Sequence, residues 1–209
     1  MKMWSDSFKD QSAIPVQYAF CAPDSQSHCI LGANKNPHFA WDEVPEATKS
    51  FVLICHDPDV PSRGDDVNQE GRTIAASLPR VDFYHWLLAD MNASMRVINA
   101  GEYSNQVTAH GKPGPQSLHG TLQGINDYTG WFASNSDMAG QYFGYDGPCP
   151  PWNDTIVHHY VFTLYALDLA QVRVVSPFNG AALRAALEGH ILATAKCTAL
   201  YSLNPEVRF

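Results

Sequence analysis

The sequence has no cluster of basic residues, no long apolar run and few charged side chains. Its 13 Lys and Arg residues are scattered among 21 Asp and Glu residues, and the formal net charge is −8. Nucleic-acid binding needs a concentrated cationic face, so this distribution counts against it. No stretch approaches the roughly 18 apolar residues of a membrane-spanning helix. The first residues also lack the apolar segment of a secretory signal, which predicts a cytoplasmic protein with no integral membrane segment.

The cysteines do not form a recognisable framework. There are five of them, an odd number, and no Cys-x-x-Cys or zinc-ribbon spacing occurs. This pattern predicts reduced thiols in a reducing compartment. The five are Cys21, Cys29, Cys55, Cys149 and Cys197.

Apolar residues are plentiful enough to build a core. They make up 45% of the chain, beside 14 Gly and 14 Pro residues, a balance that excludes disordered, collagen-like and coiled-coil proteins. The length of 209 residues fits one mainly β domain, so a single domain over residues 1–209 is expected.

Four segments have the apolar, β-branched or aromatic composition of strands: 16–20, 51–55, 83–89 and 157–167. Two polar, turn-rich segments separate them, 61–72 and 99–141. The second holds seven of the fourteen glycines and is predicted to be a long loop; long loops in compact domains are usually functional or mobile. Its aromatic residues need packing partners; they are Tyr128, Trp131 and Phe132.

The end of the chain has a different pattern. Residues 181–200 are rich in Ala and Leu, Leu183, Leu187 and Ile191 recur every four positions, and Asn179 is a plausible N-cap. This predicts one long helix. Strands first and a helix last, without βαβ alternation, predict an antiparallel sheet or sandwich with helices at one edge.

Several residues able to do chemistry follow or lie on the predicted strands. Asp57 and Asp59 come directly after 51–55 among prolines that should fix them in a rigid turn. Three prolines at 147–152 predict a stiff wall that cannot join a sheet.

Strand alternation predicts which of these side chains share a face. His158 and Tyr160 should lie together, with His159 opposite. By the same rule His85 should share a face with Phe83 and Leu87, opposite Tyr84 and Trp86.

Each of these features alone is commonly structural: a turn former, a satisfied histidine or a loop. Together they supply an acceptor (Asp57), switchable donors (His85 and His158), a phenol donor (Tyr160) and a preformed rim. This set suits a small polar or anionic group. If the histidines must be charged to bind it, affinity should fall as pH rises through the histidine range near 6.5.

Five motifs occur in a fixed order between residues 36 and 203. They are Asn-Pro-His-Phe-Ala-Trp at 36–41 with Val-Pro at 44–45, Asp-Pro-Asp-Val-Pro-Ser at 57–62, His-Trp at 85–86, Gly-Pro-Cys-Pro-Pro at 147–151 with His-His-Tyr-Val-Phe-Thr-Leu-Tyr-Ala-Leu-Asp at 158–168, and Gly-His-Ile-Leu-Ala at 189–193. In this order they resemble the phosphatidylethanolamine-binding protein family, in its bacterial branch often called Raf kinase inhibitor-like proteins.

The resemblance implies a mainly β fold, a β-sandwich of a large and a small antiparallel sheet with a C-terminal helix. It also implies a small pocket at one end that binds phosphate or the phosphoethanolamine headgroup. Carried over by position, the ligand-binding residues are Asp57, Asp59, Pro61, His85, Gly147, Pro148, Pro150, Pro151, His158 and Tyr160. Cys149 should lie close by, as a small buried apolar residue.

The chain departs from the family pattern in three places. His159 replaces a common Arg, but by alternation it faces away from the pocket. Ala199-Leu200 precedes Tyr201 where relatives often have Gly, which leaves the contribution of Tyr201 to the pocket open. The loops 62–82 and 101–141 look longer than in compact members, so part of the rim should be specific to this protein.

The resulting prediction is a non-catalytic binding protein without metal or cofactor. Its partner would be a small phosphorylated or anionic ligand. The expectation that it is not an enzyme rests on the sequence, which contains no G-x-S-x-G, Walker or H-E-x-x-H motif. The resemblance also implies a homodimer, and it makes a kinase or protease a candidate target. Two alternatives stay open: a dimeric protein-interaction scaffold, or a metal-dependent or acid–base hydrolase. The hydrolase would use His56, Asp57, Asp59, His85 and His158.

Overall fold

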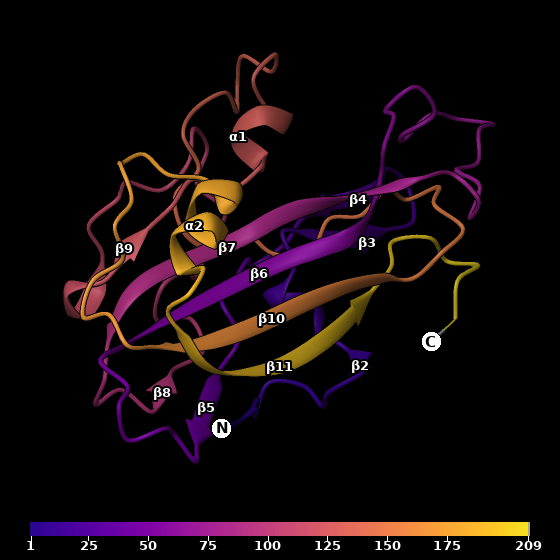
Figure 1. Ribbon diagram of the computed structural model, residues 1–209. Helices are drawn as coiled ribbons and strands as arrows, with labels where there is room; N and C mark the ends of the chain where they lie inside the picture. Colours follow the sequence, from indigo (N-terminus) through magenta and orange to yellow (C-terminus); the bar gives the residue numbers. More distant parts are fainter. Residues whose placement is uncertain (209) are drawn as a thin grey trace.

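The main layer of the molecule is a six-stranded sheet, as seen in the computed structural model, which describes residues 1–208 (Figure 1). Neighbouring strands are antiparallel except β2 and β11, which run parallel. In spatial order the strands are β2 (Ser12–Ala13), β11 (Ile191–Tyr201), β10 (His158–Leu167), β6 (Ser50–Pro61), β7 (Arg80–Asn92) and β9 (Leu122–Gln123).

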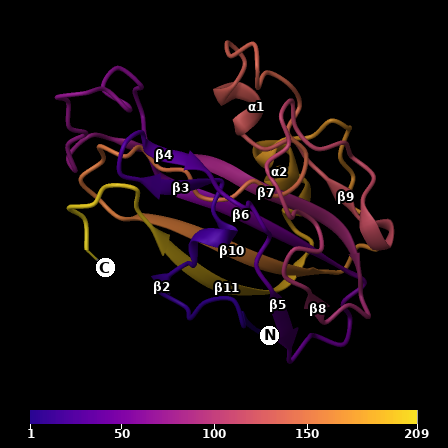
Figure 2. The ribbon, with the colours of Figure 1, turned by 180° about the vertical axis from the view of Figure 1, so that it is seen from behind.

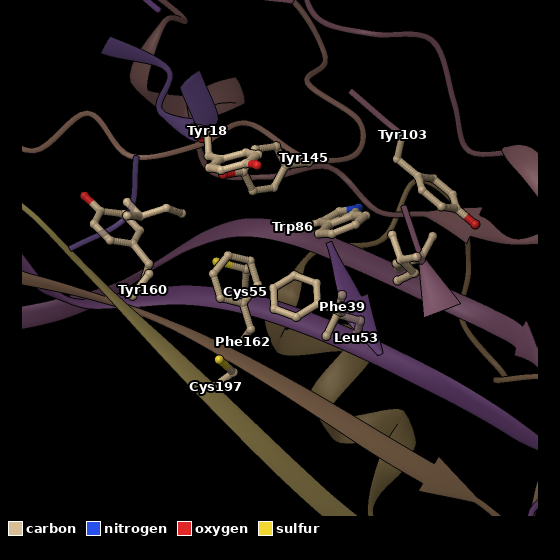
Figure 3. Packing of buried hydrophobic residues seen from close by; sticks show 14 of the residues in the cluster. Tyr18, Phe39, Leu53, Cys55, Trp86, Tyr103, Tyr145, Tyr160, Phe162 and Cys197 are labelled. Atoms are coloured by element: carbon tan, nitrogen blue, oxygen red, sulfur yellow. The ribbon is translucent and has the colours of Figure 1, made fainter. Parts of the chain in front are cut away.

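A second layer covers one face of this sheet. It consists of a three-stranded sheet and a separate hairpin, which lie on the near side in Figure 2. The strands are β1 (Lys2–Trp4), β5 (Phe39–Asp42) and β8 (Val97–Ile98), with β3 (Cys21–Asp24) and β4 (His28–Leu31) in the hairpin. Side chains of β6, β7 and β10 pack between the layers, among them Leu53, Trp86 and Phe162 (Figure 3). The predicted sandwich of a large and a small sheet is confirmed.

A short helix covers the opposite face of the large sheet. This helix, α2 (Gly180–Leu187), buries Leu183 and Leu187 against Val52, Ile54 and other apolar residues. The Asn179 side chain caps it, as predicted, by accepting a hydrogen bond from the Ala182 backbone N–H at 3.0 Å. No helix within residues 1–208 is long and apolar enough to cross a membrane.

The predicted long helix at 181–200 is wrong beyond Leu187. The chain turns at Gly189, which has φ +79°, and residues 191–201 form β11, including the 189–193 motif expected in a closing helix. Every residue from Ala193 to Tyr201 pairs with β10. The edge of β10 would otherwise have unpaired backbone groups, so tertiary pairing overrides the helix preference of Ala and Leu.

Two further local predictions are corrected. Residues 16–18 form a 3₁₀ turn, Val16–Tyr18, started by Pro15, and the strand begins only at Cys21. The segment Asp57–Pro61 is not a turn after a strand, because β6 continues through it to Pro61. The prolines leave a register shift between Asp57 and Val60 instead of ending the strand.

A bulge in β7 changes the predicted faces of that strand. His56 pairs with Tyr84 and Cys55 with Trp86, so His85 is an extra residue between two pairs. His85 therefore shares a face with Trp86 rather than with Leu87, which packs under α2. The other predicted neighbour, Phe83, does lie beside His85, with ring centroids 5.0 Å apart.

Candidate ligand-binding site

One end of the large sheet carries a cavity, here called the end cavity, of about 360 Å³. It opens where β6 finishes and where β7 and β10 begin, and the β3–β4 hairpin and the short helix α1 (Tyr128–Trp131) close its sides. It is lined by Phe20, Cys21, Leu31, Asp57, Val60, Pro61, Ser62, Arg63, Gly64, Val67, Asn68, Phe83, His85, Tyr128, Trp131, Phe132, Cys149, Pro150, Pro151 and Tyr160.

Three polar side chains, Asp57, His85 and Tyr160, form the floor of the end cavity. Each is at most 3% exposed, and the rings of His85 and Tyr160 meet edge to face with centroids 5.0 Å apart. The Tyr160 hydroxyl is directed away from the packed core (Figure 3) and makes no hydrogen bond of normal geometry with the described residues, although the Asp57 carboxylate is close enough to attract its proton. Burial, and then the nearby Asp57 carboxylate, raise the pKa of this phenol well above 10. Tyr160 therefore offers a hydroxyl group to whatever enters.

His158, which was predicted to donate to the ligand, lies behind the floor and does not line the cavity. It is fully buried, its Nδ1 is 2.7 Å from Asp57 Oδ2, and its Nε2 is 3.1 Å from Asp154 Oδ2. Burial opposes the imidazolium charge, but these carboxylates outweigh it and raise the pKa of His158 to about 9. Both ring nitrogens are therefore committed within the protein.

The charges continue in a chain behind His158. Arg80 Nη1 is 2.5 Å from Asp154 Oδ2, and hydrogen bonds from Arg80 and His158 hold the pKa of Asp154 below its ordinary value despite burial. Arg80, Asp154, His158 and Asp57 thus alternate in sign and sum to zero. Asp57 faces the cavity as a carboxylate whose charge is balanced from behind.

His85 is neutral at physiological pH. Burial dominates and lowers the pKa of His85 to about 4, against the opposing effect of Asp57 and a carbonyl hydrogen bond. Its Nδ1 lies 2.8 Å from the Asp146 carbonyl, which can only accept, so Nδ1 carries the proton and Nε2 is an acceptor. Neither histidine titrates near pH 6.5, so the predicted histidine-driven loss of affinity has no group to carry it.

The proline-rich segment forms part of the wall, as predicted, but not through all of its residues. Pro150 and Pro151 line the end cavity, whereas Gly147 and Pro148 do not. Gly147 lies where a Cβ would come within 2.1 Å of the Tyr18 carbonyl oxygen, so only glycine fits. The Pro148 carbonyl accepts backbone hydrogen bonds from Phe20 and Cys21. Gly147 and Pro148 thus hold the proline-rich wall in place from the side away from the cavity.

A buried carboxylate that the sequence prediction missed anchors this wall. Asp146 is fully buried and accepts hydrogen bonds from Asn34 at 2.7 Å, Asn126 at 2.9 Å and Lys112 at 2.6 Å. Burial raises the pKa of Asp146, although Lys112 opposes this shift. The only sequence signal for Asp146 was its position directly before the Gly-Pro motif. Its hydrogen-bond partners come from distant loops, so no local pattern could identify them.

The structure joins Cys21 to Cys149 in a disulfide, with Cα atoms 4.8 Å apart. The prediction of reduced thiols is therefore wrong for these two, and Cys149 is not simply a small apolar residue. Cys29, Cys55 and Cys197 are free. Both half-cystines line the end cavity, so the disulfide ties the β3–β4 hairpin to the proline-rich wall.

The remaining predicted positions divide between wall and scaffold. Pro61 lines the cavity, whereas Asp59 does not and instead accepts hydrogen bonds from the His159 backbone and ring, both at 2.8 Å. His159 faces away from His158, as predicted. Tyr201 does not line the cavity, because its hydroxyl donates to the Cys21 carbonyl at 2.8 Å. Within residues 1–208, no three or more His, Cys, Asp or Glu residues are grouped to hold a metal ion.

The structure is thus a two-layer β-sandwich with a polar-floored cavity at one end. The family model of phosphatidylethanolamine-binding proteins matches residues 4–202, and the chain belongs to this family. It is 31% identical over 202 residues to the UPF0098 protein YbhB of Escherichia coli, covering 97% of this chain and 100% of YbhB.

Other relatives agree in length and fold. A UPF0098 protein of Methanothermobacter thermautotrophicus is 31% identical over 204 residues, covering 96% of this chain and 98% of the relative. The crystal structure of Escherichia coli YbcL, described as a new member of the mammalian PEBP family, is 26% identical and superposes with a TM-score of 0.68, covering 96% and 97% of the two chains. None of these three names is an enzyme name.

Proposed function

We propose that this protein binds a small phosphate or phosphomonoester group on the floor of the end cavity, in the form that still carries one proton. The observation that carries the proposal is the Tyr160 hydroxyl, a buried donor without a partner among the described residues. Buried polar groups are nearly always hydrogen-bonded, so a ligand oxygen is the expected acceptor.

The other two floor groups accept hydrogen bonds rather than donate them. Asp57 already accepts from His158 and from the Asp59 backbone N–H, and His85 presents an unprotonated Nε2. A fully ionised anion would therefore face two acceptors. A phosphomonoester monoanion instead brings one P–O–H donor for Asp57 or His85 and further oxygens for Tyr160. Phosphoethanolamine adds an ammonium group, from which Asp57 can also accept a hydrogen bond.

The proton requirement predicts an unusual pH dependence. The second pKa of a phosphomonoester is about 6, and His85 and His158 keep their charge states between pH 5.5 and 7.5, because their pKa values are about 4 and about 9. Affinity for phosphoethanolamine should therefore fall about tenfold per pH unit above about 6. Titration calorimetry across this range measures it.

Sulfate is the matched control ligand, because it has the same tetrahedral shape but no proton at these pH values. We expect it to bind at least tenfold more weakly than phosphate at pH 6. Equal binding of sulfate and phosphate, or affinity that is constant or rises with pH, would show that the site does not select a protonated group.

A further inference from the structure

The long loop that the sequence predicts at 99–141 contains a second cavity, here called the loop pocket, of about 220 Å³. Its lining residues all lie between 101 and 112, and among them only Glu102 and Lys112 are charged. None of them lines the end cavity. The loop pocket is therefore a separate site, built from one segment that is rich in polar side chains.

Two buried asparagines hold this segment in shape. The Asn36 side-chain carbonyl accepts hydrogen bonds from the Tyr103 and Ser104 backbone N–H groups at 2.8 Å and 3.0 Å. The Asn34 side-chain amide donates to the Gln106 carbonyl at 3.2 Å, and the Asn34 backbone carbonyl accepts from the Ser104 hydroxyl at 2.7 Å. Because both asparagines are fully buried, the loop pocket is formed before any ligand enters it.

Lys112 supplies the pocket with an ammonium group that has hydrogen-bond donors to spare. Its side chain is only 13% exposed, and its Nζ donates to the Asp146 carboxylate at 2.6 Å. This is the one side-chain hydrogen bond that Lys112 makes within residues 1–208, whereas an ammonium group has three donors. The remaining N–H groups suit a ligand oxygen, and a carboxylate oxygen is the acceptor that binds them most strongly.

Glu102 supplies the opposite charge. Its Oε1 lies 2.7 Å from His119 Nε2, and its Oε2 accepts from the Asn99 backbone N–H at 2.8 Å. Burial would raise the pKa of Glu102, but these hydrogen bonds outweigh it and hold this pKa below its ordinary value. Glu102 therefore lines the loop pocket as an ionised carboxylate, whose oxygens can accept further hydrogen bonds.

The size of the loop pocket limits what can join these two charges. One water molecule takes a share of about 30 Å³ in the liquid, so about 220 Å³ holds roughly seven non-hydrogen atoms. Alanine and serine are of this size, whereas phenylalanine is nearly twice as large. A zwitterion also brings one charge of each sign to a pocket that presents one of each.

We propose that the loop pocket binds a small α-amino acid as its zwitterion, with the carboxylate at Lys112 and the ammonium group at Glu102. A simple anion would satisfy Lys112 but face the Glu102 carboxylate, and a simple cation would leave the spare donors of Lys112 without an acceptor. The loop pocket shares no lining residue with the end cavity, so this inference does not depend on the binding of phosphate.

The test follows the backbone amide signals of residues 101–112 by NMR, in the full chain labelled with nitrogen-15, while ligand is added at pH 6. Alanine is compared with lactate, which has a hydroxyl in place of the ammonium group, and with alaninamide, which has a neutral amide in place of the carboxylate. Alanine should shift these signals saturably and bind at least tenfold more tightly than either analogue. Phenylalanine should bind at least tenfold more weakly than alanine, because it exceeds the volume of the pocket.

A charge-removing variant assigns the ammonium group to its partner. Glu102→Gln should weaken alanine binding at least tenfold and leave lactate binding no weaker. Glu46→Gln is the matched control, since Glu46 is exposed and lies outside the lining of the loop pocket, and it should change neither affinity. Methyl phosphate, which is small enough to occupy the floor of the end cavity alone, should bind to the wild type and to both variants equally.

The outcomes are distinct from those of the proposed function. If lactate or alaninamide binds as tightly as alanine, the zwitterion is wrong. If the signals of residues 101–112 do not move, or only those of end-cavity residues move, the loop pocket is not the site. The ligand comparison uses the wild-type chain, so it decides the matter even if Glu102→Gln fails to fold. Failure of methyl phosphate to bind would overturn the proposed function and leave this inference standing.

Discussion

At the scale of single residues, Tyr160 and Tyr201 form an instructive pair of buried phenols. Both are at most 5% exposed, but the Tyr201 hydroxyl donates to the Cys21 carbonyl, whereas the Tyr160 hydroxyl has no partner among residues 1–208. A satisfied phenol stabilises the fold. An unsatisfied one at a cavity floor costs stability unless a ligand completes it.

Replacing Tyr160 by Phe should therefore separate binding from stability. A hydrogen bond to a charged ligand contributes about 1.5–3 kcal/mol, so Tyr160→Phe should weaken methyl phosphate binding by roughly tenfold to a hundredfold. Its free energy of unfolding should stay equal or rise. Calorimetry and urea denaturation measure the two effects.

Tyr201→Phe provides the matched control. It should lower the free energy of unfolding by about 1 kcal/mol and leave affinity unchanged. If Tyr160→Phe bound methyl phosphate as well as the wild type, the hydroxyl would not be a ligand contact.

Sequence reasoning grouped His158 with Asp57, His85 and Tyr160, whereas the structure brings only the latter three together at the cavity floor and places His158 behind them. Strand alternation puts His158 and Tyr160 on one face, yet two residues along a strand are about 7 Å apart. That separation is enough to place Tyr160 at the cavity and His158 behind it. Asp154, which contacts His158, comes from a loop, and Arg80, which contacts Asp154, comes from β7, which β6 separates from β10. No local pattern links these residues.

At the scale of elements, the predictable parts are those decided by local pattern. The buried runs in β6, β7 and β10 and the cap at Asn179 could be read directly. The bulge at His85 could not, since it depends on the register with β6. The change from helix to strand after Leu187 depends on β10 needing a partner at its edge. The sequence of each segment alone contains neither fact.

The Cys21–Cys149 disulfide should contribute strongly to stability. It links positions 128 residues apart, and closing a loop of about 100 residues stabilises by roughly 4–5 kcal/mol in the chain-entropy model. The Cys21→Ser/Cys149→Ser double variant should lose about this amount in urea denaturation. Adding a reductant should destabilise the wild type to a similar extent.

Cys29→Ser is the control for this experiment, because Cys29 is a free, half-buried cysteine on the adjoining strand β4. It should keep the sensitivity to reductant. A wild-type midpoint that did not respond to reductant would contradict the disulfide.

At the scale of the whole molecule, two buried histidines should give stability a maximum near pH 6.5. The pKa of His158 is raised from 6.5 to about 9, so its contribution is complete below pH 6.5 and is lost as pH rises towards 9. The pKa of His85 is lowered from 6.5 to about 4, so the unfolded chain binds a proton first and stability falls as pH decreases from 6.5 towards 4.

Each of these shifts corresponds to about 3 kcal/mol. Urea denaturation at intervals from pH 4 to 9.5 should show both losses. A free energy of unfolding that rises from pH 7 to 9 would contradict the assigned charge on His158.

The order of strands in the large sheet has a consequence for how the protein is made in a cell. β6 is one of the two central strands and its first six residues are buried, but one of its two neighbours is β10, and β10 needs β11 in turn. Tyr201, the last residue of β11, follows Pro61 by 140 residues. At about 5–20 residues per second, the ribosome delivers it roughly 7–28 s later. During that interval one edge of the growing sheet lacks its partner, first the edge of β6 and then the edge of β10, and aggregation starts on such edges. Chaperone cover on the translating ribosome should therefore matter more for the yield of this protein than its final stability does.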